Sequence, residues 1–336
     1  MSKQEVLGRL LVEEVGLSVL FVLAFANGAN DVGKSVASLM STAGPDGPRL
    51  RRRALLWGGV FSGLGSISAI LISGRLLTVF TPQSILRNST DSFFILAVLV
   101  GATIWILIAT LFRLPVSTTH TILGAVLLQG IFLFGVSSLK LDFLAIRVIL
   151  PLAAGPFVAL IALSILRRLT RRPQTQTSER KSPRFAKISH WGSAAATAYA
   201  RGINDAPKMA ALGAFFFVAG STYAVWGPYS IVAVAILAGS LVLGHRVALE
   251  LVKRVVPLDH TQRLQAGIVT AALVSVGAYL GAPLSTTHVH EGSTAGIGGR
   301  KEVIVSALRG MVLPWSVTLP AAGLLAVTVA FLVARV

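Results

Sequence analysis

The sequence contains no cysteine, so disulfide bonds and thiol chemistry play no part in it. Charged side chains make up only 13 % of its 336 residues, about half the share that is usual in soluble globular domains. Acidic residues are the scarcest, with 13 Asp and Glu against 30 Lys and Arg. The alternating apolar and polar pattern of membrane β-barrel strands is missing as well. These absences argue against a soluble domain, a disulfide scaffold and a barrel.

Long apolar runs are present instead. Residues 54–74, 92–112, 142–166 and 227–244 each approach the roughly 20 residues that a helix needs to span a bilayer. Residues 1–14 mix Lys, Arg and Glu and show no cleavable signal peptide, so the first apolar run is expected to be a span. The sequence therefore predicts an all-α integral membrane protein.

The net charge of +17 is concentrated in polar segments between the apolar runs. Four arginines lie within residues 49–53, and eight Lys or Arg residues lie within residues 167–187. Loops retained in the cytoplasm are rich in Lys and Arg, so both segments are predicted to be cytoplasmic in a multi-pass protein of the plasma or inner membrane. Because topology explains these charges, we expect no nucleic-acid partner.

Two polar motifs occur twice in this apolar background. Residues 25–34 (FANGANDVGK) return as residues 199–208 (YARGINDAPK), offset by 174 positions. Residues 115–120 (PVSTTH) return as residues 283–288 (PLSTTH), offset by 168 positions. The chain is thus an internal duplication, and duplicated polar motifs at membrane depth are typical of transporters.

The basic loops also predict the topology. Placing them inside gives five crossings in each half, about ten in all, and an odd number turns the two halves into inverted repeats. The predicted units are a first repeat at residues 1–166, a basic cytoplasmic linker at 167–187 and a second, inverted repeat at 188–336. Residues 114–139 and 283–299 open near a proline, so we expect broken or re-entrant helices there.

Each copy of the first motif carries an Asn-Asp pair beside a glycine: Gly28, Asn30 and Asp31, then Gly202, Asn204 and Asp205. A buried polar group without a partner is costly in lipid, so these side chains need ligands. We expect the glycines to loosen the helix and let Asn and Asp hold a cation or a substrate. The alternative is a local ion pair, because a lysine follows each aspartate by three residues, at Lys34 and Lys208. If the aspartates are engaged elsewhere, the two lysines would attract an anion.

Three hydroxyl residues follow the proline of each second motif: Ser117, Thr118 and Thr119, then Ser285, Thr286 and Thr287. Hydroxyls and free backbone N–H groups at a helix start form an anion site. Helix packing by small polar residues is the alternative. The next residue in each copy, His120 or His288, is a candidate for a proton relay, with a structural histidine as the alternative.

Residues 28–35 match the phosphate-binding P-loop pattern G-x-x-x-x-G-K-[ST]. A P-loop follows a strand of a parallel sheet, whereas this segment is flanked by membrane helices. The second copy places Pro207 where the pattern requires glycine. A nucleotide-dependent membrane pump is therefore only a remote alternative.

Together the four motifs resemble the inorganic phosphate transporter (PiT) family. The resemblance rests on G-A-N-D-V at 28–32, G-x-N-D at 202–205, and P-x-S-T-T-H with a later glycine at 115–124 and 283–292. It covers both halves of the chain. It implies inverted repeats, a central phosphate site, cation-coupled uptake without a cofactor, and commonly a homodimer.

The resemblance also implies roles for particular residues. The six hydroxyl residues after the two prolines would donate hydrogen bonds to phosphate, joined by Asn30 and Asn204. Asp31 and Asp205 would hold the coupling cation or phosphate, and sodium would bind among these two Asn-Asp pairs. The sodium-coupled pattern often continues N-D-V-A-N, whereas this chain has Lys34 and Lys208. A fixed positive charge there could replace sodium, which favours proton coupling or an altered anion preference.

The sequence thus predicts a secondary transporter rather than an enzyme. We expect symport of inorganic phosphate with sodium or a proton, across the bilayer and by alternating access. A permease for sulfate or a related oxyanion is the alternative. Phosphate retains a proton near neutral pH and sulfate does not, so the carboxylates of Asp31 and Asp205 favour phosphate.

Overall fold

The computed structural model describes residues 3–40, 47–170, 183–218, 220–254, 260–298 and 314–333. Within these ranges the chain is helical apart from short connections and contains no β-sheet. The predicted all-helical class is confirmed. Seven of the described helices are long and apolar enough to cross a membrane. The count of ten crossings stays a prediction, because length and composition do not fix how deep the shorter helices reach.

The first half contains eight α-helices within the described ranges. They are α1 (Lys3–Met40), α2 (Gly47–Ile72), α3 (Gly74–Val79), α4 (Pro82–Ile85), α5 (Ser92–Leu111), α6 (Thr118–Phe134), α7 (Leu141–Phe143) and α8 (Leu150–Thr170). A π-helical segment, Leu144–Ile149, joins the last two into one long rod. The second half supplies α9 (Pro183–Gly213), α10 (Thr222–Val242), α11 (Gly244–Arg254), α12 (His260–Leu280), α13 (Thr286–Gly298) and α15 (Leu319–Val333).

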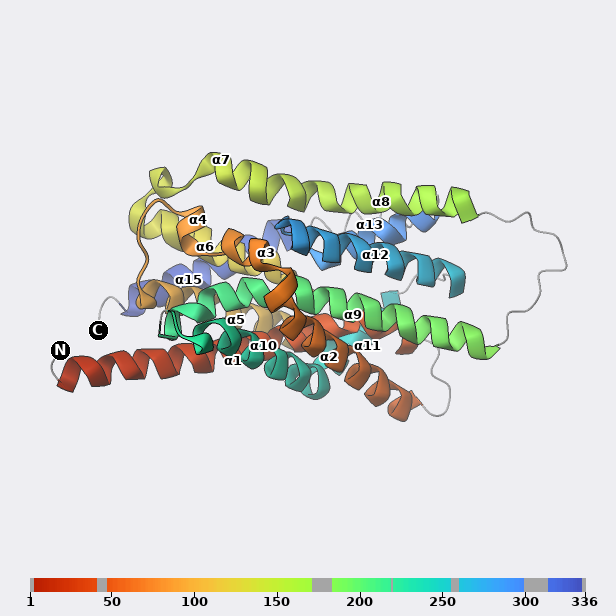
Figure 1. The fold of residues 1–336 in the computed structure, drawn as a ribbon, viewed down its shortest axis with the longest axis horizontal. Helices are drawn as coiled ribbons and strands as arrows, with labels where there is room; N and C mark the ends of the chain where they lie inside the picture. Colours follow the sequence, from red (N-terminus) through yellow and green to blue (C-terminus); the bar gives the residue numbers. More distant parts are fainter. Residues whose placement is uncertain are drawn as a thin grey trace.

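Helices α1 and α9 each carry one copy of the first motif and run in opposite directions (Figure 1). Helix α2 packs against α9 in the same way that its counterpart α10 packs against α1. The two connecting helices α2 and α10 also pack against each other. This reciprocal arrangement agrees with the predicted inverted repeats.

The last helix of each half packs on the other half. Helix α15 lies against α5 and α6 of the first half, and α8 lies against α12 and α13 of the second (Figure 1). The last helix of each half therefore packs on the hairpin of the other half, so the two halves exchange their last helices. The order of apolar runs along the sequence does not predict this exchange.

Helices α5 and α6 form a hairpin, and so do α12 and α13. Residues 114–117 and 282–285 are non-helical, so the predicted breaks near the two prolines are confirmed. Both breaks begin with a residue of positive φ, Arg113 (61°) and Gly281 (76°), which ends the preceding helix. The two hairpins occupy opposite ends of the molecule, and their tips meet near its middle (Figure 1).

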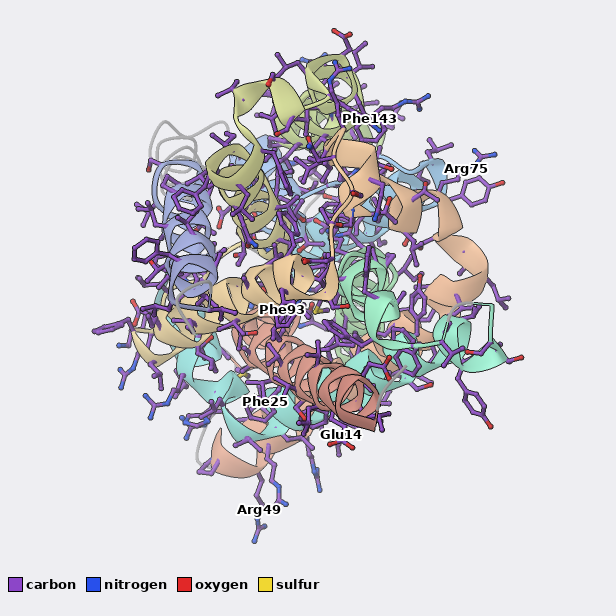
Figure 2. All side chains as sticks on the ribbon, turned by 90° about the vertical axis from the view of Figure 1, so that its left-hand side faces the viewer. Glu14, Phe25, Arg49, Arg75, Phe93 and Phe143 are labelled. Atoms are coloured by element: carbon purple, nitrogen blue, oxygen red, sulfur yellow. The ribbon has the colours of Figure 1, made fainter. Side chains whose placement is uncertain are left out.

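The predicted linker, residues 167–187, is partly helical. Helix α8 continues to Thr170, and α9 begins at Pro183, where proline suits the first turn of a helix. The rest of the linker, residues 171–182, lies outside the described residues, as do Gly299 and the basic pair Arg300 and Lys301. Among the described arginines, Arg49 and Arg75 extend outward from the bundle (Figure 2).

The largest buried cluster joins apolar side chains of α1, α5, α6, α9 and α10, among them Leu20, Leu99, Ile122, Met209 and Ile236. Many apolar side chains also point outward, for example Leu71 at 84 % and Leu324 at 61 % exposure. Such a surface suits contact with lipid rather than water. The buried cluster packs the two motif helices into the centre of the bundle.

Candidate functional site

The first motif lies on unbroken helices. Residues 28–35 fall within α1 and residues 202–209 within α9. The expectation that Gly28 and Gly202 loosen these helices is wrong. A Cβ at Gly28 would overlap the carbonyl oxygen of Ile236, and one at Gly202 would overlap that of Ser62, so both glycines serve close helix packing. A P-loop is also excluded, because the backbone N–H groups of residues 28–35 lie inside a continuous helix rather than in a phosphate-binding loop.

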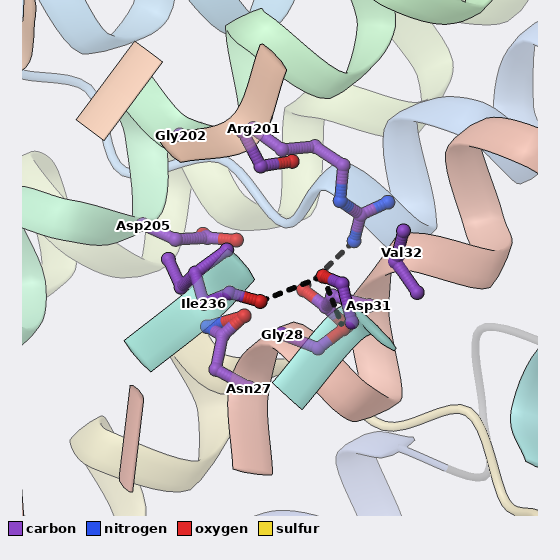
Figure 3. Close-up of a pocket in the computed structure, with 10 residues that line it drawn as sticks. Asn27, Gly28, Asp31, Val32, Arg201, Gly202, Asp205 and Ile236 are labelled. Carbon is purple, nitrogen blue, oxygen red and sulfur yellow. Dashed lines mark hydrogen bonds and ion pairs between the residues drawn. The ribbon is translucent and has the colours of Figure 1, made fainter. Parts of the chain in front are cut away.

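The two aspartates lie in buried ion pairs, of which Figure 3 shows the one between Asp31 and Arg201. Asp31 is paired with Lys34 on its own helix and with Arg201 on α9, where Nη2 lies 2.8 Å from Oδ2. Asp205 is paired with Lys208, with 3.1 Å between Oδ1 and Nζ. Both local Asp-Lys pairs considered as the alternative therefore form. The ion pair with Arg201 is an addition that crosses between the repeats.

Arg201 belongs to the second copy of the motif, but sequence reasoning assigned it no role. Its counterpart by the offset of 174 residues is Asn27. Asn27 Nδ2 donates to Thr118 Oγ1 at 2.9 Å, and Arg201 Nη2 donates to Thr286 Oγ1 at 3.0 Å. The two residues thus tie each motif helix to a hydroxyl of its own hairpin tip. One feature of the sequence could have revealed Arg201: it is charged, whereas the equivalent residue of the first copy of the motif, Asn27, is neutral.

Asn30 fastens the first hairpin tip to α1. Its Nδ2 donates to Thr110 Oγ1 at 3.1 Å and to the carbonyl of Leu114 at 2.9 Å, and its Oδ1 accepts the N–H of Val116 at 3.0 Å. All of its hydrogen-bonding groups are used. Positioning of the tip is therefore the role that this geometry gives Asn30.

Asn204 is bonded less completely. Its Nδ2 donates to Asp205 Oδ1 at 2.9 Å and to the carbonyl of Leu284 at 3.1 Å. Its Oδ1 has no hydrogen-bond partner among the described residues, although the side chain is fully buried. The second repeat thus offers a vacant acceptor that the first repeat does not.

The two lysines contact the hairpin tips as well as the aspartates. Lys34 Nζ donates to the carbonyl of Val116, and Lys208 Nζ donates to the equivalent carbonyl of Leu284 at 3.3 Å. Lys208 also donates to Thr119 Oγ1 at 2.6 Å. Each ammonium group therefore sits among oxygen atoms of a carboxylate and a backbone carbonyl, the ligand types that a sodium ion also takes in transporters.

The second motifs meet at the tips. Ser285 Oγ donates to Ser117 Oγ at 3.0 Å. His120 Nδ1 lies 2.8 Å from Ser117 Oγ, and His288 Nδ1 lies 2.5 Å from Ser285 Oγ. The two imidazole rings are 4.9 Å apart between centroids. A hydrogen-bonded chain of two serines and two histidines thus connects the repeats.

The remaining hydroxyls of the motifs are buried beside this chain. Thr119 Oγ1 donates to the carbonyl of Leu284 at 3.3 Å, across the repeats. Thr287 Oγ1, its counterpart, has no hydrogen-bond partner within the described part of the chain. Hydrogen bonds and ion pairs thus connect the Asn, Asp and Lys side chains of the two motif helices with the two hairpin tips at one central place. This arrangement leaves free acceptor or donor capacity at Asn204 and Thr287.

Charge at this central site is unbalanced. The three cations Lys34, Lys208 and Arg201 face the two carboxylates Asp31 and Asp205, which leaves one net positive charge. Between α1 and α9 lies a cavity of about 10 Å³, lined among others by Asn27, Asp31, Arg201 and Asp205 (Figure 3). Such a volume holds about one water molecule. The arrangement can attract an anion, but a larger ion enters only if the helices separate.

Two hairpins that meet tip to tip between antiparallel motif helices define a multi-pass membrane transporter with inverted repeats, not an enzyme. A model of the phosphate transporter family matches the chain twice, at residues 27–181 and 164–326. The chain belongs to this family, and the resemblance to the PiT family is confirmed.

The names of curated relatives agree with this assignment, and a solved structure shares the fold. A protein of Mycobacterium tuberculosis named "Probable low-affinity inorganic phosphate transporter" is 29 % identical, over 89 % of this chain and 72 % of its own length. A Bacillus subtilis protein of the same name is 24 % identical, over 90 % of this chain and 93 % of its own length. The solved structure named "The sodium-dependent phosphate transporter" shares the fold with a TM-score of 0.81 and 18 % identity, and covers 97 % of this chain and 100 % of its own.

Proposed function

We propose that this phosphate transporter is a cation-coupled symporter that imports inorganic phosphate by alternating access. The observation that carries the proposal is the contact between Ser117 and Ser285, which places two helix starts head to head beside a net positive charge. Helix N-termini and hydroxyls favour an anion, and the excess cation adds long-range attraction. The names of the relatives supply phosphate as the substrate.

Phosphate would bind between the hairpin tips and the two motif helices. The proposed donors are the hydroxyls of residues 117–119 and 285–287 together with the guanidinium of Arg201, which can hold phosphate with two N–H groups. The amides of Asn30 and Asn204 would position the tips around it. In the present structure these donors, apart from Thr287, bond to protein groups, so phosphate must displace some of these bonds as the cavity opens.

The coupling ion is proposed to be a proton rather than sodium. Sodium would have to bind among Asn30, Asp31, Asn204 and Asp205, but Asp31 and Asp205 already accept from lysine ammonium groups and Asn30 Oδ1 accepts the Val116 N–H. Hydrogen phosphate carries two negative charges and would turn the net charge of the site from +1 to −1. One proton, taken by a carboxylate or by the phosphate itself, would restore neutrality, and neutrality lowers the cost of crossing the membrane.

His120 and His288 support the choice of a proton. Their bonds to Ser117 and Ser285 form a continuous chain through the site, along which a proton could pass by rearrangement of hydroxyl and imidazole hydrogens. If the histidines are only structural, their hydrogen bonds hold the two tips together and carry no proton. The variants His120→Gln and His288→Gln distinguish the two roles: a change in the pH dependence of phosphate uptake indicates a proton relay, and an unchanged pH dependence indicates a structural role.

Alternating access would come from movement of one hairpin unit relative to the other. Each unit consists of a hairpin and the last helix of the other half, so α5, α6 and α15 can move together, as can α8, α12 and α13. Separation of the tips on one side would open the cavity to that side only. The inverted repeats supply two equivalent arrangements for the two directions.

The same proposal includes the setting of the protein. We place it in the plasma or inner membrane, with residues 1–166 and 188–336 as the two repeats and the basic segment 167–187 in the cytoplasm. A homodimer is the proposed assembly, in line with the family resemblance. A permease for sulfate is the alternative, because a tetrahedral oxyanion of similar size fits the same donors.

Uptake of radiolabelled phosphate into liposomes that contain the purified protein tests this proposal. We expect accumulation driven by an inward proton gradient, unchanged when choline replaces sodium, and unaffected by an excess of unlabelled sulfate. Accumulation of sulfate without phosphate uptake would replace the substrate. Uptake that requires a sodium gradient would replace the coupling ion.

A further inference from the structure

A second, larger cavity lies away from the central site. It has a volume of about 420 Å³ and sits where the start of α2, the end of α10 and helix α11 come together. Its lining residues are Pro48, Arg51, Arg52, Leu55, Leu241, Val242, His245 and Leu249. The cavity lies beside the start of α2, which carries the arginine cluster 49–53, whereas α3 and α4 follow the other end of α2. No motif discussed above accounts for it.

The cavity exists because α10 stops and the chain turns. The N–H of Leu243 closes α10 onto the carbonyl of Gly239, and α11 starts at the next residue. Helix α11 is held against α1, where Gly33 leaves so little room that a Cβ would lie 2.6 Å from Ala248. Because α11 is fixed on α1, its other side faces the start of α2 across the cavity.

The lining separates into a basic rim and an apolar wall. Arg51, Arg52 and His245 supply the rim, and Arg51 Nε is oriented by a bond of 3.1 Å to the carbonyl of Gly47. The wall consists of leucine and valine side chains. None of the lining residues that the structure describes is acidic, and the nearby Glu250 is paired with Lys253 at 3.3 Å.

The apolar wall continues to the outer surface of the bundle. Leu241 is 40 % exposed and Val242 is 58 % exposed, on a helix that is long and apolar enough to span a bilayer. A free phosphate ion would gain nothing from this wall. A molecule with an anionic phosphate and a hydrocarbon chain would match both parts of the lining.

We infer that this cavity is a binding site for an anionic phospholipid of the leaflet that faces the basic loops. The headgroup phosphate lies between Arg51 and Arg52, which present planar, always charged guanidinium groups suited to phosphate. The first part of an acyl chain follows Leu55, Leu241 and Val242 toward the surrounding lipid. His245 closes the rim from the side of α11.

This site has a structural connection to the transport site. Helix α11 packs on the part of α1 that carries Gly33 and, next to it, Lys34. A lipid that bridges α2 and α11 fixes the position of α11 and therefore supports this part of α1. Lipid binding to the native state alone also raises the unfolding temperature.

The test measures lipid retention by the full-length protein, purified in detergent and stripped of native lipid. Native mass spectrometry records bound phosphatidylglycerol and phosphatidylcholine, each added at equal concentration. We expect preferential retention of phosphatidylglycerol by the wild type. The double variant R51Q/R52Q is expected to bind it about 25-fold more weakly, from about a factor of five for each arginine near an anionic lipid.

The matched control removes the same charge elsewhere. The double variant R75Q/R87Q changes two exposed arginines that do not line the cavity, one in α3 and one after α4, and is expected to retain phosphatidylglycerol like the wild type. As a second measurement, the unfolding temperature of the wild type should rise with phosphatidylglycerol and not with phosphatidylcholine. This measurement does not depend on phosphate transport.

Three outcomes would overturn the inference. Equal retention by the wild type and R51Q/R52Q would remove the arginines from lipid binding. Displacement of the lipid by millimolar inorganic phosphate would identify a site for the free anion instead. A change in the proportion of dimers in R51Q/R52Q, with lipid retention unaltered, would identify the cavity as a contact between two copies of the chain.

Discussion

Asp31 of α1 and Arg201 of α9 form a buried ion pair with 2.8 Å between Oδ2 and Nη2, and this pair joins the two repeats at the centre of the bundle. Arg201 also donates to Thr286 on the second hairpin tip. One guanidinium therefore connects both motif helices and a hairpin. Any movement that opens the site must keep, exchange or break these bonds.

The first prediction concerns this pair. Asp31→Asn leaves Arg201 buried with one partner fewer, and breaking one side of a buried pair costs about 3–5 kcal/mol. We expect Asp31→Asn and Arg201→Gln each to lower stability and abolish phosphate uptake. The double variant should lose less stability than the sum of the two single losses, because neither Asp31 nor Arg201 is then left buried without the other, although Lys34 still lacks its carboxylate partner. Chemical denaturation in detergent measures the free energy of unfolding of the three variants and hence the coupling between Asp31 and Arg201. Losses of stability that simply add in the double variant would contradict this coupling.

The second prediction concerns the lysines. Lys208→Asn removes an ammonium group that donates to Asp205, Thr119 and the carbonyl of Leu284, and leaves oxygen atoms in its place. We expect Lys208→Asn, and equally Lys34→Asn, to gain a sodium-dependent rise in unfolding temperature that the wild type lacks. Lys253→Asn makes the same change at an exposed position and serves as the control. Sodium stabilisation already present in the wild type would count against the proposed exchange of sodium for lysine.

The third prediction concerns the tips. Ser117→Ala and Ser285→Ala each remove one hydroxyl of the bond between the hairpins. We expect each to reduce phosphate uptake at least about tenfold, equivalent to about 1.4 kcal/mol, through the loss of one buried hydrogen bond. Each variant also removes the bond of that serine to its own histidine, but the bond between the two serines is lost in both, so the double variant should lose less than the product of the two single losses. Initial uptake rates in liposomes provide the measurement, and independent, multiplying losses would show that the serines act separately.

The fourth prediction concerns helix packing. Gly28→Ala places a Cβ against the carbonyl oxygen of Ile236, so we expect a loss of about 1–3 kcal/mol of stability from overpacking. Gly8→Ala on the same helix meets nothing within 4 Å and should be neutral or stabilising by up to about 1 kcal/mol. Thermal unfolding of the two variants side by side gives the comparison. Equal behaviour would mean that α1 and α10 do not pack as closely as described.

The fold class, the helix breaks and the identity of the central polar residues could be predicted from the residue types and from the internal duplication. The all-helical class and the helix breaks near Pro115 and Pro283 followed from long apolar runs and from the restrictions that proline imposes. The repetition of hydroxyls, aspartates and lysines in both halves was visible, and the family resemblance implied that they form one central site. These features are encoded by local sequence patterns or by motifs that occur in both halves, so one sequence is enough to predict them.

Other features depend on three-dimensional packing and could not be read in this way. The continuity of α1 at Gly28 depends on how closely α10 approaches, which no local pattern encodes. The role of Arg201 depends on its distance to Asp31 across the repeats, although its contrast with Asn27 was visible. The exchange of α8 and α15 between the halves is invisible because apolar helices of similar composition can pack in several ways.

The exchange of the last helices also has a consequence for biosynthesis. The hairpin of α5 and α6 leaves the ribosome early, yet α15, the helix that covers it, is the final described helix of the chain. Until the chain has been translated through α15, the first hairpin lacks the helix that packs on α5 and α6, and its tip gains the facing Ser285 only when the second tip has been made. The transport site is therefore assembled only after synthesis of the second half, and a ribosome that stalls before α15 would leave a half-built site exposed in the bilayer.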